Sequence, residues 1–152
     1  MTLAALALAG AALSTAGPRD ARAAAPVRVR VAAVAAATNP CSLVSADQAS
    51  RIVGARVLSS REAPLGPTCI YAFRRKASDV TIVIESLTLK RAIGTLRRPS
   101  KFLLRGRLSY CGTLGHQVLF TSLPRGKVLS VSAPCATARR FAQQALIHLR
   151  VG

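Results

Sequence analysis

The alternation of hydrophobic and polar positions predicts two β-hairpins. Residues 68–75 and 80–87 alternate with a period of two, and a polar turn separates them, so they form one antiparallel hairpin. Residues 116–122 and 127–133 form a second hairpin around a Pro-Arg-Gly turn. In the first hairpin, the apolar side chains that share one side of the sheet are Cys69, Tyr71, Phe73, Val80, Ile82 and Ile84.

Helices are predicted at both ends of this region. Ser45 and Gln48 form a capping box at the start of a short helix over 46–53, which Gly54 ends. Residues 136–150 repeat apolar residues every three or four positions, which is typical of an amphipathic helix that covers a sheet. We expect its buried side to hold Ala138, Phe141, Ala142, Ala145, Leu146 and Leu149, and its wet side Arg139, Arg140 and Gln143.

The remaining segments give weaker patterns. Residues 55–60 fit a strand and 61–67 a Pro/Gly loop, whereas 88–98 fit a helix that ends before Pro99. Residues 100–115 are mixed. The order of elements predicts an α+β fold: a single small domain with an antiparallel sheet of two hairpins, packed by a short N-terminal helix and a C-terminal helix.

The N-terminal region reads as a secretory leader. Residues 3–13 are apolar and precede an Ala-Arg-Ala site at 21–23, although no basic residue comes before them. The apolar run is too short for a transmembrane segment. The alternative is an alanine-rich tail that is not cleaved. We expect a signal peptide over 1–23, a flexible arm over 24–38 and a secreted domain over 39–152.

Four cysteines in a small exported chain imply two disulfides rather than a metal or redox site, because no Cys-x-x-Cys occurs. We favour Cys41–Cys69 with Cys111–Cys135, in which each bridge closes a loop in its own half. The pairing Cys41–Cys111 with Cys69–Cys135 remains the rival. A lipid anchor on Cys41 is not expected, since Thr-Asn-Pro precedes it instead of small aliphatic residues.

The chain is strongly basic, and this charge favours polyanionic partners. Loss of residues 1–23 lowers the formal net charge only from +17 to +16. Arginine far outnumbers lysine and alanine is abundant, so the bias of a GC-rich genome explains the charge equally well. The residues that could bind anions are Arg74, Arg75, Lys76, Arg97, Arg98, Lys101, Arg105 and Arg107.

Catalytic residues are scarce. The histidines are His116 and His148, and no nucleophile elbow, His-Glu-x-x-His or phosphate-binding loop occurs. A Cys111–His116 nucleophile pair would fail once Cys111 is oxidised. We therefore predict no enzyme activity, no cofactor and no metal site.

The layout resembles a domain family of unknown function found in secreted proteins and envelope lipoproteins of high-GC Gram-positive bacteria. The residues that carry the resemblance are Asn39-Pro40-Cys41-Ser42-Leu43-Val44-Ser45, Val53-Gly54, Cys69-Ile70-Tyr71, the strand 80–84, Leu114-Gly115 and the terminal helix. The chain departs from the family in lacking a lipobox and in having His116 where many members have an acid. The resemblance implies export and a small α+β domain, and it supplies no catalytic residues.

These observations predict a secreted or extracytoplasmic, non-catalytic domain that is associated with the cell envelope. Its expected partner is an anionic envelope polymer or a lipid surface. The alternative is a basic nucleic-acid-binding protein, cytosolic or exported. With no tryptophan and few other aromatic residues, the chain gives stacking of single strands little support.

Overall fold

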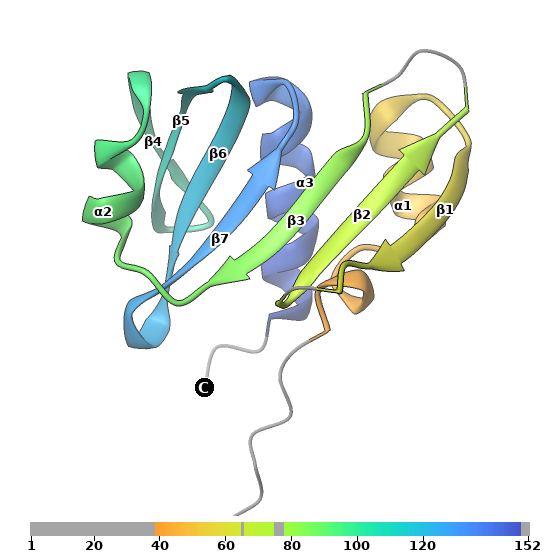
Figure 1. Ribbon diagram of the computed structural model, residues 1–152, viewed down its shortest axis with the longest axis horizontal. Coiled ribbons are helices and arrows are strands. Elements are labelled where there is room, and N and C mark those ends of the chain that lie inside the picture. The colour runs from red at the N-terminus through yellow and green to blue at the C-terminus, as the bar shows by residue number, and fades with distance from the viewer. Residues whose placement is uncertain (1–38, 65, 75–77, 150–152) are drawn as a thin grey trace, which may run out of the picture. The chain divides into compact units, whose positions relative to one another are not determined.

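The computed structural model describes residues 39–64, 66–74 and 78–149. They form one antiparallel sheet of seven strands in the order β1-β2-β3-β7-β6-β5-β4 (Figure 1). The strands are β1 (Val57–Glu62), β2 (Thr68–Phe73), β3 (Val80–Glu85), β4 (Arg97–Leu104), β5 (Arg107–Leu114), β6 (His116–Leu123) and β7 (Lys127–Ser132). The helices are α1 (Ala46–Val53), α2 (Leu89–Gly94) and α3 (Cys135–His148), with short 3-10 turns η1 (Pro40–Ser42) and η2 (Pro124–Gly126).

The main core lies on one face of the sheet, which we call the first face. There α1 and α3 lie side by side behind the strands in Figure 1 and cover alternate residues of β2, β3, β6 and β7. Tyr71 and Phe141 are its largest fully buried side chains, and their rings lie 5.6 Å apart. This burial supplies most of the favourable free energy of folding, since it scales with the apolar area removed from water.

A smaller core lies on the opposite, second face. The residues of β6 alternate between the two cores: Leu119 belongs to the first, and Val118 and Phe120 belong to the second. Ala92 of α2 packs against these two residues and Val128, so α2 covers this face beside β6 and β7. The two sides of the sheet are therefore covered unequally.

Two disulfides join η1 and α3 to the sheet. Cys41–Cys69 connects η1 to β2, and Cys111–Cys135 connects β5 to the first residue of α3. Their sequence separations are 28 and 24 residues. The pairing within each half is confirmed.

The α+β class, the helix over 46–53, both hairpins and the buried side of the last helix are confirmed. Ser45 and Gln48 form the capping box, and Gly54 ends α1 with φ 74°. The predicted signal peptide and arm lie outside the described residues. None of the helices within the described ranges is both long and apolar enough to span a membrane.

Three segments differ most from the sequence prediction, and other ends of elements shift by only one or two residues. The first strand runs from Val57 to Glu62, so it takes two residues from the predicted loop. The predicted helix over 88–98 ends at Gly94, and β4 begins at Arg97 and passes through Pro99. The unassigned segment 100–115 forms most of the β4–β5 hairpin, which Arg105 and Gly106 connect, both with positive φ.

Candidate anion-binding groove

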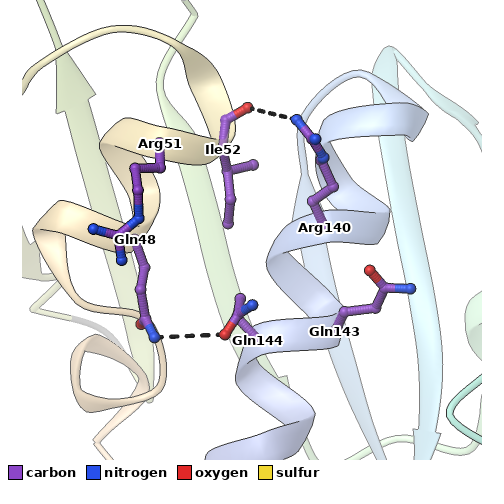
Figure 2. Close-up of a pocket in the computed structure, with 6 residues that line it drawn as sticks. All are labelled: Gln48, Arg51, Ile52, Arg140, Gln143 and Gln144. Carbon is purple, nitrogen blue, oxygen red and sulfur yellow. Dashed lines mark hydrogen bonds between the residues drawn. The ribbon is translucent and has the colours of Figure 1, made fainter.

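A groove runs between α1 and α3 on the outer side of the first face. Three side chains come from each helix: Gln48, Arg51 and Ile52 from α1, and Arg140, Gln143 and Gln144 from α3 (Figure 2). Residues three and four apart lie on the same side of a helix, so each set forms one ridge. The groove is the space between these two ridges.

Gln48 is held in place by two sets of hydrogen bonds. Its backbone N–H donates to Ser45 Oγ at 3.2 Å, and its side-chain Oε1 accepts from the Ser45 N–H at 2.9 Å. The same side chain donates from Nε2 to Gln144 Oε1 across the groove at 3.5 Å (Figure 2). The capping box that starts α1 therefore also orients one wall of the groove.

Arg140 closes the other end. Its Nη1 donates to the carbonyl oxygen of Ile52 at 3.5 Å, which gives a partner to a carbonyl in the last turn of α1 (Figure 2). A guanidinium has five N–H donors in a planar fork, so donors remain for a ligand. The bond places an exposed cationic group at the groove.

The chemistry of the groove suits an anion. Its volume is about 300 Å³, and its lining holds two arginines and three glutamines but no carboxylate. Guanidinium groups bind carboxylates and phosphates through paired hydrogen bonds, and the amide N–H groups of glutamine add further donors. Arg51 also lines a neighbouring hollow with Arg56, where the carboxylate of Asp47 offsets part of the positive charge.

The predicted basic residues that the structure describes are spread out rather than gathered into one pocket. Arg74 follows β2, and Arg75 and Lys76 lie outside the described residues. Lys101 lies opposite Tyr110 on the second face, whereas Arg107 lies opposite Leu104 on the first. The rest are exposed along β4 and its turn: Arg97, Arg98 and Arg105.

The structure gives each residue considered for catalysis another role or position. Cys111 is bonded to Cys135, which removes the thiolate from the proposed Cys111–His116 pair. His116 Nε2 lies 3.1 Å from Ser132 Oγ at an exposed end of the sheet, and His148 ends α3. Among the described residues, no group of His, Cys, Asp or Glu could hold a metal ion.

The sequence pattern singles out three of the six groove residues, but for other roles. Gln48 is recognised only as part of the capping box, and Arg140 and Gln143 only as the wet side of the last helix. Arg51 carries no signal at all. Their common site depends on the packing of α1 against α3, two helices separated by more than eighty residues of chain. No local pattern contains that information.

The fold defines a small α+β domain with one antiparallel sheet and two disulfides. No protein-family model, curated protein or solved structure matches the chain.

Proposed function

We propose that this chain is a secreted, non-catalytic domain of the cell envelope that binds anionic envelope components. The observation that carries the proposal is the α1–α3 groove, where two guanidinium groups and three amides line one hollow without a carboxylate. The ligand chemistry is a phosphate or carboxylate group. Such groups occur on anionic polymers and on lipid headgroups.

The charge of the whole chain supports this assignment. At a formal net charge of +17, an approaching polyanion is attracted from a distance, and the groove gives it a defined place to bind. The exposed arginines of the β4–β5 hairpin extend the attraction along the sheet edge. Such long-range attraction weakens as salt is added, because the Debye length falls to about 8 Å at physiological ionic strength.

The disulfides support an extracytoplasmic location. Disulfides persist in oxidising compartments and are rare in the cytosol. Both bridges fasten the main core of this domain, so the reducing cytosol would weaken the fold. The proposal of a non-catalytic domain is supported by the disulfide of Cys111, which leaves this residue no thiol to act as a nucleophile.

Binding to defined probes tests the proposal. Polyphosphate, poly-glutamate and phosphatidylglycerol vesicles would be titrated with the full chain and with three double variants that each remove two charges. Arg51→Gln/Arg140→Gln alters the groove, Arg98→Gln/Arg105→Gln alters the hairpin, and Arg61→Gln/Arg125→Gln is the control. We expect the groove variant to lose at least about tenfold in affinity, and the control to change by less than about threefold.

The three probes distinguish the sources of the anionic group. Tight binding to polyphosphate or poly-glutamate without vesicle binding assigns a polymer, and the reverse assigns a lipid surface. Equal losses in all three double variants would contradict a role for the groove and leave only diffuse attraction. Thermal unfolding of each variant checks that Arg140→Gln leaves the fold intact.

A single-stranded DNA of matched charge serves as a further probe. The aromatic residues Tyr71, Phe73 and Phe120 are buried in the two cores, so these three provide no stacking surface for bases. We therefore expect DNA to bind no more tightly than polyphosphate. Tighter binding to DNA would contradict the envelope assignment and favour nucleic-acid binding.

A further inference from the structure

We infer that a second hollow, on the opposite face of the sheet, binds a small zwitterion with an apolar body, such as a free α-amino acid. The hollow lies between α2 and the strands β3, β7 and β6, and its volume is about 550 Å³. That size falls in the range of small-molecule sites, roughly 300–1,000 Å³. The inference stands apart from the anion-binding groove, which lies on the other side of the sheet.

The floor of the hollow is apolar because of strand register. Val83 of β3 lies opposite Ser130 of β7, which lies opposite Phe120 of β6, so these three residues share the second face. Phe120 and Val118 are buried, and Leu87 and Ala92 close the side towards α2. An apolar ligand body placed here would be removed from water, which favours binding.

Two opposite charges line the same hollow. Glu85 comes from the end of β3, and Arg91 comes from α2. A carboxylate accepts hydrogen bonds from an ammonium group, and a guanidinium donates two to a carboxylate. A ligand that carries both charges and an apolar side chain would use the acid, the base and the floor together, whereas a simple anion would leave Glu85 unpaired.

The far end of the hollow is lined by polar side chains. His116 and Ser132 are joined by their 3.1 Å hydrogen bond, and Ser130 is a further buried hydroxyl. Both His116 and Ser132 also line an adjoining hollow of about 520 Å³ that Asp79 borders. The apolar body of the ligand therefore has room to extend along β7 from the charged end towards this pair.

Three matched probes test the inference with the disulfide-bonded full chain. L-Leucine carries both charges, 4-methylpentanoate lacks the ammonium group, and 3-methylbutylamine lacks the carboxylate. We expect saturable leucine binding by calorimetry, with amide NMR shifts at Val83, Val118 and Phe120. Each single-charge probe should bind at least about tenfold more weakly.

Variants of Glu85 and Arg91 test which charged group of leucine each residue binds. Glu85→Gln should remove the preference for leucine over 4-methylpentanoate, and Arg91→Gln the preference over 3-methylbutylamine. The controls Glu62→Gln and Arg125→Gln lie outside the hollow and should bind leucine normally. The groove variant Arg51→Gln/Arg140→Gln should also bind leucine normally, which separates this site from the proposed function.

Two results would overturn the inference. One is the lack of saturable leucine binding up to about 10 mM, which would mean that Glu85 and Arg91 serve only as surface charges. The other is equal binding of all three probes, which would mean that the hollow recognises the apolar body alone.

Discussion

Gly112 lies where β5 passes close to the segment that joins α2 to β4. A Cβ atom at this position would lie 2.9 Å from the carbonyl oxygen of Arg97 and 3.1 Å from Cβ of Leu96. The first of these neighbours is backbone, so it has little freedom to move. Glycine is required here for close packing.

We therefore predict that Gly112→Ala destabilises the protein by about 1–3 kcal/mol, through overpacking of the second face. Gly94→Ala is the matched control, because a Cβ at Gly94 would meet nothing within 4 Å at the end of α2. Alanine there should be neutral or stabilising by up to about 1 kcal/mol. Urea unfolding of both variants measures the difference, and equal midpoints would contradict the close-packing argument.

Tyr71 is a polar residue at the centre of the main core. Its hydroxyl donates to the carbonyl oxygen of Val44 at 2.6 Å, and the side chain is fully buried. Burial raises the pKa of Tyr71 from 10.0 to about 12, because the charged phenolate would lose its hydration. The folded state thus favours the neutral phenol.

This pKa shift predicts a pH dependence of stability. Between pH 10 and 12 the unfolded chain releases the Tyr71 proton while the folded chain keeps it, so stability falls as pH rises. The contribution is fully present below pH 10 and declines by about 1.4 kcal/mol per pH unit within that window. Tyr71→Phe should lack this component.

The measurement compares the free energy of unfolding of the unchanged protein and of Tyr71→Phe at each pH. Titration of the lysines affects both proteins equally and cancels in the difference. At pH 8 the Tyr71→Phe variant should be less stable by about 1–3 kcal/mol, because the Val44 carbonyl loses its donor. That gap should shrink above pH 10. A constant gap from pH 8 to 12 would contradict the raised pKa.

At the scale of elements, the buried strands were predictable, whereas the edge strand β1 was shifted by two residues and the edge strand β4 was missed. β2 and β3 alternate strictly between buried and half-buried residues, and this alternation is visible in the sequence. In β4 only Leu104 is buried, so Arg97–Leu104 shows no alternation. The edge strand β1 has no buried residue.

The end of α2 was misplaced for a related reason. Pro99 was taken as the residue that stops a helix, whereas it lies in an edge strand, where the lack of an N–H costs no hydrogen bond on the open side. Arg98 has a φ of 50° at the point where the register of β4 shifts. Arginine gives no signal for such a conformation, so the irregular start of β4 is set by tertiary contacts.

The disulfides act at this same scale, because each joins two elements of the main core. We predict that Cys41→Ser/Cys69→Ser lowers the free energy of unfolding by about 2–4 kcal/mol, as expected for loops of this length. The double substitution avoids a free thiol. Cys111→Ser/Cys135→Ser should have a similar effect, and unchanged unfolding midpoints in both would contradict the role of the bridges.

At the scale of the whole molecule, the sequence predicted the class of fold but not the sites. The α1–α3 groove and the hollow beside α2 are each lined by residues from elements far apart in the chain. In the sequence these residues fit only local roles, such as a helix cap or an exposed helix side. The charge of +17 favours an anionic partner without locating a site, and the α1–α3 groove is where we propose that such a partner binds.

Export of the molecule is tested by its intact mass in the natural host. We predict a chain that begins near Ala24 and gains about 4 Da on reduction, two hydrogens for each disulfide. The reduced, denatured protein is the control. A full-length mass with four free thiols would place the protein in the cytosol and contradict the envelope assignment.

The two disulfides also have a consequence for motion, because both fasten the first face. On the second face, within the part of the chain that the structure describes, α2 packs in a small cluster of four buried residues and three half-buried leucines, and neither disulfide reaches it. Parts of a protein with few buried contacts open separately, at a lower free energy than global unfolding. Amide hydrogens of α2 should therefore exchange with solvent faster than those of α3, and the hollow beside α2 is the one able to widen while the rest of the domain stays closed.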